Sequence, residues 1–185
     1  MAMAATGASK IRVWDLFVRA FHWSLVAVFA LAWATPHVSE SLHGWLGYTA
    51  ALLIVARAIW GFVGPRYARF VQFVRAPRDV IAYLIAIAKG NEARYLGHNP
   101  AGGAMIVVLL LGVAGAVLSG WLLTTDWFWG SEAAEAAHSL VVHGVLVLVA
   151  LHLAGVALAS FRHRENLPRA MVSGDKRAPE ASDVA

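Results

Sequence analysis

The sequence contains no cysteine, and it contains few charged residues for its length. Without cysteine the chain cannot form disulfides, iron–sulfur clusters, a thiolate-ligated haem or a c-type haem attachment. Only 14% of the 185 residues are charged, whereas 59% are hydrophobic. A soluble domain of this length would need more charge to cover its surface. The composition therefore predicts an integral membrane protein, whose remaining metal ligands are histidine, methionine and carboxylate.

Four stretches are long and apolar enough to cross a bilayer core, which requires about 20 residues. They run over residues 14–34, 43–63, 101–125 and 138–161. The last two contain no Asp, Glu, Lys or Arg, and the second is interrupted only by Arg57. Tryptophans lie near the ends of these stretches, as in an interfacial aromatic belt. We predict an all-α integral membrane protein with a bundle of four transmembrane helices.

The basic residues orient this bundle. Lys and Arg lie around the start of the first span, between the second and third spans, and after the fourth, whereas the other two connections carry only acidic charges. By the positive-inside rule both termini are cytoplasmic. The net charge of +4 then indicates contact with anionic lipid headgroups rather than with nucleic acid. An N-terminal signal peptide is the alternative, but its cleavage would discard His22.

Two segments outside the spans have a composition of their own. Residues 66–95 alternate basic and apolar positions. This pattern predicts an amphipathic connection on the cytoplasmic surface, and an ordinary amphipathic linker would show it too. Residues 173–185 are polar, and we expect them to form a disordered cytoplasmic tail.

Four histidines lie in or at the edge of the predicted spans: His22, His43, His138 and His152. Because a helix turns 100° per residue, His152 returns to within about 40° of the direction of His138, roughly 21 Å further along the axis. His43 begins its span on the periplasmic side, as does His138. His22 lies nearer the cytoplasm, as does His152. The expected pairs are His43 with His138 and His22 with His152, which is the layout of two stacked bis-histidine haems.

The other histidines do not share that face. His143 is about 140° from His138 and about 180° from His152 around the same helix. We expect it to contact a neighbouring helix or a partner subunit rather than a metal. The remaining three lie in turns or in a basic stretch and are predicted to be surface residues: His37, His98 and His163.

Arg57 follows His43 by fourteen residues, so it lies on nearly the same face and at the depth of the second pair. A guanidinium inside the bilayer is unfavourable unless it is paired. A haem propionate would pair with it, and so would a lipid headgroup if the side chain extended to the cytoplasmic surface. The third span carries small residues that let a helix or a porphyrin approach its backbone: Gly112, Gly115, Ser119 and Gly120.

Four short motifs rich in aromatic, glycine and basic residues follow one another along the chain. They are VWD (13–15) with RAFHW (19–23), HGWLGY (43–48), Arg57 with WGFVGPR (60–66), and YLGHNP (95–100). In this order, over about residues 10–165, they resemble the bacterial cytochrome b561 family. That family overlaps the b-type cytochrome subunits of nickel–iron hydrogenases. The resemblance indicates a cytochrome b561-like membrane domain over residues 1–172.

The resemblance implies a four-helix bundle that holds two b haems through four histidines, at the positions already singled out by geometry. Relatives usually lack a histidine at the place of His143. The implied function is electron transfer across the bacterial inner membrane, between the quinone pool and a redox partner. That partner would be a periplasmic cytochrome c or a dehydrogenase or hydrogenase subunit, docking near Trp127, Trp129, Glu132 and Glu135. Bis-histidine ligation favours electron transfer over oxygen chemistry.

Two other functions stay open at this point. The chain could be an oxidoreductase in its own right, which oxidises a small periplasmic donor such as superoxide and reduces quinone. It could also be a transporter whose histidines hold zinc or copper, although the spans contain almost no carboxylate and no cysteine. A homodimer is open as well, because its interface would use the same small and aromatic residues as the bundle.

Overall fold

The computed structural model describes residues 10–184, so the first nine residues of the predicted domain and the last residue of the predicted tail lie outside it. Four helices dominate the fold: α1 (Leu16–Ala34), α2 (Glu40–Val63), α5 (Pro100–Leu122) and α6 (Glu132–Arg162). All four are long and apolar enough to cross a membrane. The four-span helical bundle is therefore confirmed.

The helix ends follow capping residues rather than hydropathy. Asp15 caps α1 by accepting a hydrogen bond from the backbone N–H of Val18 at 3.1 Å, which explains an acidic residue at the edge of a span. Ser131 caps α6 in the same way, and Glu132 and Glu135 favour its first turn. For this reason α6 begins at Glu132 and not at His138. Hydropathy alone does not register these polar first turns.

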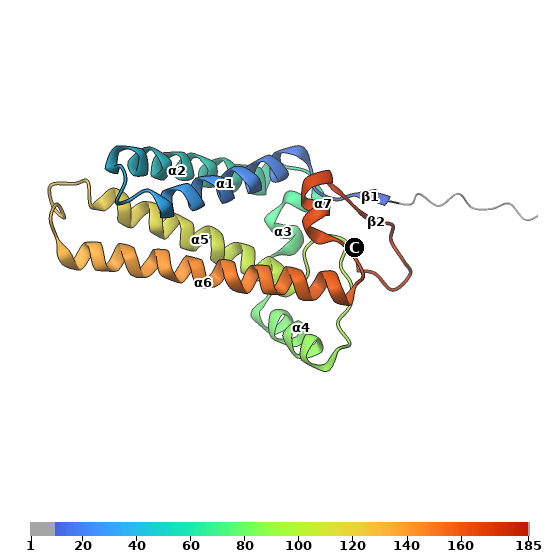
Figure 1. Cartoon of the computed structure of the whole chain (residues 1–185). Coiled ribbons are helices and arrows are strands. Elements are labelled where there is room, and N and C mark those ends of the chain that lie inside the picture. Colours follow the sequence, from blue (N-terminus) through green and yellow to red (C-terminus); the bar gives the residue numbers. More distant parts are fainter. Residues whose placement is uncertain (1–9, 185) are drawn as a thin grey trace, which may run out of the picture.

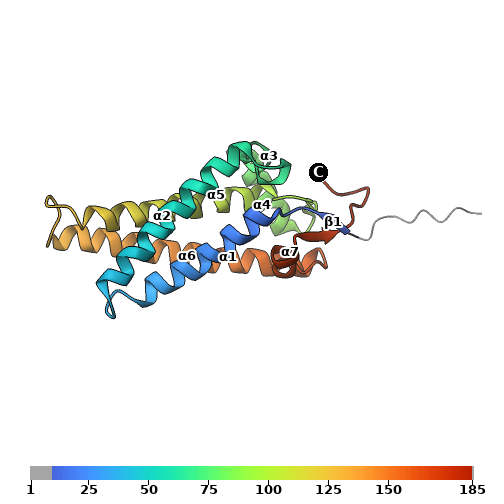
Figure 2. The same ribbon diagram turned by 90° about the horizontal axis from the view of Figure 1, so that it is seen from above.

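The helices form two pairs that cross each other. Helix α1 packs along α2, α5 packs along α6, and α2 also contacts α5. Seen from above, α1 and α2 run obliquely over the α5–α6 pair (Figure 2). Helices α5 and α6 approach closely because a Cβ at Gly112 would lie only 3.0 Å from Val145 Cγ2. The small residues of the third span therefore serve helix packing.

Much of the bundle surface is apolar. Leu52 on α2, Leu111 on α5 and Leu153 on α6 are 70%, 67% and 61% exposed. A water-soluble protein would cover such residues, whereas lipid tails solvate them. The two ends of the bundle differ in construction (Figure 1). At one end, which we call the loop end, there are only the connections over residues 35–39 and 123–131.

The opposite end, which we call the capped end, comprises residues 10–15, 64–99 and 163–184. Its elements are β1 (Lys10–Arg12), η1 (Arg66–Ala68), α3 (Phe70–Phe73), α4 (Pro77–Lys89), α7 (Leu167–Ser173) and β2 (Asp175–Arg177). The predicted amphipathic connection over residues 66–95 is thus divided into three short helices. Of these, α4 buries Tyr83 and exposes Ile81 and Leu84. Both described termini lie at this end (Figure 1).

The tail is folded, which corrects the expectation of disorder from residue 173 onward. Strand β2 pairs antiparallel with β1, and Val184 pairs with the backbone at Arg94 and Leu96. The buried side chain of Arg94 bonds the carboxylates of both Glu165 and Asp183. These partners are 71 and 89 residues away in the sequence. A local polar composition cannot reveal such pairing, and that is why the prediction was wrong.

Candidate functional site

Two of the predicted histidines meet near the loop end. His43 lies in the first turn of α2 and His138 in the second turn of α6. Their ring centroids are 6.3 Å apart, with an interplanar angle of 89°. Where two imidazoles bind one metal ion from opposite sides, bonds of about 2 Å put the ring centroids roughly 6 Å apart. The observed separation therefore fits a pair of axial ligands with one metal ion between them.

Both rings are held at Nδ1, which leaves Nε2 free. Nδ1 of His43 lies 2.9 Å from the carbonyl oxygen of Ala32, and a carbonyl can only accept, so this nitrogen carries the proton. Nδ1 of His138 lies 2.9 Å from Ser119 Oγ, whose own hydroxyl donates to the Ala116 carbonyl. Each Nε2 then keeps an unprotonated lone pair. This is the form in which a histidine with a second hydrogen bond binds a metal.

Glycines shape the space around this pair. A Cβ at Gly120 would lie 3.1 Å from Cε1 of His138, so that ring packs directly on the backbone of α5. One turn from His43, apart from the adjoining backbone of α2 itself, nothing described lies within 4 Å of the place where a Cβ at Gly47 would be. Open space on the face of a candidate ligand is what a flat macrocycle requires. The residues of the loop end therefore fit a haem.

The second predicted pair lies nearer the capped end. His22 lies on α1 and His152 on α6, each in the half of its helix nearer the capped end. Nδ1 of His22 is enclosed without a hydrogen-bond partner, and its ring meets Trp23 edge-on at 5.0 Å. Among residues 10–184, no three histidine or acidic side chains gather as a metal-binding group. The predicted arrangement in pairs suits a haem iron, which two imidazoles complete, whereas structural zinc takes four ligands.

Arg57 is enclosed by the protein near this second pair. Its side chain is 3% exposed, its guanidinium lies 5.1 Å from the Phe70 ring centroid, and Nη2 donates to the Ala68 carbonyl at 3.1 Å. Nη1 has no partner. The charge of Asp15 acts on this guanidinium without forming an ion pair with it, so a closer carboxylate would stabilise the buried cation. The enclosure excludes the alternative in which Arg57 extends to lipid headgroups.

His98 is a residue that the sequence misplaced. It was expected on the surface, but its ring is packed between Trp14 at 4.5 Å and Phe73 at 4.8 Å. Burial, and then the charges of Arg57 and Lys176, lower the pKa of His98 to about 3, so the ring is neutral. Its Nδ1 has no hydrogen-bond partner. His98 and Arg57 therefore both pack near the Phe73 ring, and each has an unpartnered nitrogen atom.

The sequence around His98 predicts the helix that follows it but not the enclosure of its ring. Asn99 caps α5 by accepting from the Gly102 N–H at 2.7 Å, and Pro100 takes the first helical position, as an Asn-Pro pair predicts. What encloses His98 comes from elsewhere in the chain. Trp14 lies at the start of α1, and Gly174 of the tail accepts its backbone N–H. No signal in the Tyr95–Pro100 motif indicates this cover.

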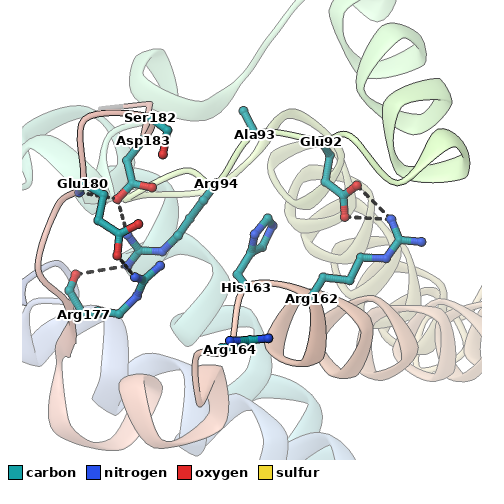
Figure 3. Close-up of a pocket in the computed structure, with 10 residues that line it drawn as sticks. All are labelled: Glu92, Ala93, Arg94, Arg162, His163, Arg164, Arg177, Glu180, Ser182 and Asp183. Carbon is teal, nitrogen blue, oxygen red and sulfur yellow. Dashed lines mark hydrogen bonds and ion pairs between the residues drawn. The ribbon is translucent and has the colours of Figure 1, made fainter.

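The remaining predicted residues lie apart from the two pairs. His37 and His143 are exposed. His163 lines a pocket of about 380 Å³ at the capped end, together with Arg162, Arg164 and Arg177 (Figure 3). Most charged residues of this pocket already form ion pairs with other residues of the protein. Arg162 bonds Glu92 and Arg94 bonds Asp183, as the dashed lines in Figure 3 mark.

Two comparisons with known proteins match this chain over most of its length. The family model described as prokaryotic cytochrome b561 matches residues 13–174. A relative from Bradyrhizobium diazoefficiens, named a probable Ni/Fe-hydrogenase B-type cytochrome subunit, is 22% identical over 217 residues. The match covers 93% of this chain and 88% of the relative. No solved structure matches the chain.

Proposed function

The chain belongs to the prokaryotic cytochrome b561 family, and we propose that its four membrane histidines hold two b haems, one near each end of the bundle. Membership makes it a multi-pass b-type cytochrome of the bacterial inner membrane that acts in electron transfer. His43 and His138 are the proposed ligands near the loop end. His22 and His152 are the proposed ligands near the capped end.

One observation carries this proposal. The rings of His43 and His138 are 6.3 Å apart while each Nδ1 is occupied by a hydrogen bond from the ring to the protein. A pair of histidines that served only packing would not need two free Nε2 atoms, through which the two residues would hold a haem. The second pair is supported by the helical repeat, because His138 and His152 share one face of α6.

The protein residues keep both sites suited to electron transfer alone. When bound, a b haem supplies a one-electron iron couple. With two histidines holding it, each haem would transfer electrons rather than bind oxygen. Ala32 and Ser119 fix the orientation of the rings near the loop end. Near the capped end, the unpartnered Nη1 of Arg57 would hold a haem propionate, and the neutral ring of His98, which also packs against Phe73, would offer a second nitrogen.

We place the capped end in the cytoplasm, because the basic residues gather there, and the loop end in the periplasm. Electrons then cross the membrane between the quinone pool and a redox partner. The exposed Trp127 and Trp129, 91% and 77% accessible, lie beside the acidic start of α6 at the loop end. A periplasmic cytochrome c or an enzyme subunit would dock there. The printed name of the Bradyrhizobium relative supports an enzyme partner.

The test is electron transfer across a sealed vesicle. Purified protein is reconstituted in liposomes that contain ferricyanide, and dithionite is added outside. The trapped ferricyanide should be reduced at a rate that depends on the protein. His22→Ala or His43→Ala should abolish this rate, whereas His37→Ala in the exposed α1–α2 turn should leave it unchanged. A rate that survives both ligand substitutions would overturn the proposal.

The exchange with quinone needs its own measurement. A short-chain quinol added to the purified protein in detergent should reduce the bound haem, seen as growth of the reduced α-band. If dithionite reduces the haem and the quinol does not, the electron-transfer role stands and quinone is the wrong partner.

A further inference from the structure

His143 faces away from the bundle. It precedes Val145 by two residues, which is a rotation of about 200° around α6. Val145 is 1% exposed and packs on α5 at Gly112. His143 is exposed on the opposite side, between the depths of His138 and His152. A polar ring therefore points outward from the membrane-spanning part of the helix.

The hydrogen bonds of His143 fix which atoms it offers to a neighbour. Its Nδ1 lies 2.7 Å from the carbonyl oxygen of Ser139 and 3.3 Å from Ser139 Oγ. A carbonyl can only accept, so Nδ1 carries the proton and Nε2 is an acceptor. The hydroxyl of Ser139 keeps its proton as a donor. In hydrocarbon neither group has water to bond, so both remain unsatisfied unless a neighbour supplies a partner.

The residues around His143 suit a closely packed helix. The outward face repeats at alternating steps of four and three residues, the period of a left-handed helix pair. It consists of six exposed residues: Ala136, Leu140, His143, Val147, Ala150 and Ala154. Three of the six are alanines, and beside them no side chain or other segment comes within 4 Å of the Cβ position of Gly144. Small residues let two helices approach, and one polar residue in such a seam fixes its register.

We propose that this face binds α6 of a second copy of the chain. The Ser139 hydroxyl of each copy donates to Nε2 of His143 in the other. Donor and acceptor lie one turn apart on one face, so the face complements itself around a two-fold axis. Both copies insert with the same topology, and this places the axis along the membrane normal and makes the two α6 helices parallel. Residues one turn apart meet across such a parallel pair.

The absence of cysteine makes a crosslinking test direct. Val147→Cys places a single thiol on the proposed face, and Leu153→Cys places one about 120° around the same helix. The two parent residues are 60% and 61% exposed, so they are matched in accessibility. In native membranes under mild oxidation, Val147→Cys should form a disulfide-linked dimer and Leu153→Cys should not. Equal crosslinking at both positions would overturn the proposal.

A second measurement tests the hydrogen bonds. His143→Leu should weaken dimerisation in detergent roughly tenfold, because two symmetric interhelical bonds are lost. His143→Gln, which keeps an acceptor, should weaken it less, and Ser139→Ala should resemble His143→Leu. The haem spectrum of each variant should be unchanged, since His143 is not a proposed ligand, and this serves as the folding control. A monomeric mass for the unaltered protein, or a dimer that His143→Leu leaves intact, would show that another occupant covers this face.

Discussion

The loop end and the capped end hold the same kind of histidine pair in different ways. Near the loop end, His43 and His138 are oriented by Ala32 and Ser119, on the neighbouring helices. Near the capped end, the surroundings of the second pair depend on segments far apart in the sequence, tied together by a buried ion network. The comparison shows that the site near the loop end depends only on contacts between neighbouring helices. The other depends on the folding of the whole chain.

The largest expected effect breaks the loop end alone. Gly47→Leu adds a side chain to the open space beside His43, where, apart from the adjoining backbone of α2 itself, nothing described lies within 4 Å of the Cβ position. The Gly47→Leu variant should lose the haem near the loop end and keep the other haem, so its haem content should fall by half. Leu52→Phe, on the opposite face of the same helix, should keep both haems. Pyridine haemochrome measurements on the two variants decide the matter, and full haem content in Gly47→Leu would contradict this account of the space.

The next effect breaks the capped end alone. Arg94→Ala leaves the buried carboxylates of Glu165 and Asp183 without their main partner, which should cost about 3–5 kcal/mol. Hydrogen exchange over residues 165–184 should rise strongly, while exchange near the loop end stays the same. Arg162→Ala breaks a more exposed pair with Glu92 and should cost less. Equal protection in Arg94→Ala and the unaltered protein would show that the network does not hold the cap.

Acid should destabilise the capped end more than the loop end, by a smaller amount than the substitution of Arg94. Burial opposes the charge of Glu165, yet the hydrogen bond from Arg94 and the charge of Lys176 hold the pKa of Glu165 below its ordinary value of 4.5. A depressed carboxyl pKa stabilises the fold above pH 4.5, and this stability is lost as the pH falls through the lower, folded value. The pKa of His98, lowered to about 3, acts in the same direction from pH 6.5 downward.

The measurement is hydrogen exchange of the capped end between pH 7 and pH 3, corrected for the intrinsic effect of pH on exchange. Protection of residues 165–184 should decline across this range, and it should decline before protection of α5 does. A decline that is uniform along the chain would contradict the assignment of acid sensitivity to the capped end.

The smallest expected effect concerns the ring of His138. The hydrogen bond between Nδ1 of His138 and Ser119 raises the basicity of this ligand and so favours oxidised iron. Ser119→Ala removes that hydrogen bond and should therefore favour reduced iron. A net hydrogen bond of about 0.5–1.5 kcal/mol corresponds to roughly 20–60 mV for one electron, so the midpoint potential of the loop-end haem should rise by that amount. Thr49→Ala removes a hydroxyl that bonds only the Trp45 carbonyl and should not shift it. A potentiometric titration compares the two.

The same division explains what could be predicted from the sequence. The four spans follow from hydropathy, and the common face of His138 and His152 follows from the helical repeat. These features depend on neighbours within one helix. The closeness of His43 to His138 was predicted from depth alone.

The features that sequence reasoning missed depend on distant contacts. His98 is covered by Trp14, and Arg57 is enclosed by Phe70 from the connection after α2. The tail is ordered because Lys176 and Asp183 find partners at Glu165 and Arg94. His98, Lys176 and Asp183 each resemble surface residues when only their own segments are considered, and for Arg57 the sequence left a haem propionate and a lipid headgroup as alternative partners. Their burial is decided by which segments meet at the capped end.

The central claim is that two pairs of histidines hold two haems at two depths. The most direct test is a dithionite-reduced minus oxidised spectrum of the detergent-purified protein, with haem per chain from the pyridine haemochrome. The account predicts two b haems per chain, and one in each of His22→Ala, His43→Ala, His138→Ala and His152→Ala. A single haem in the unaltered protein, or two haems in any of these variants, would contradict it.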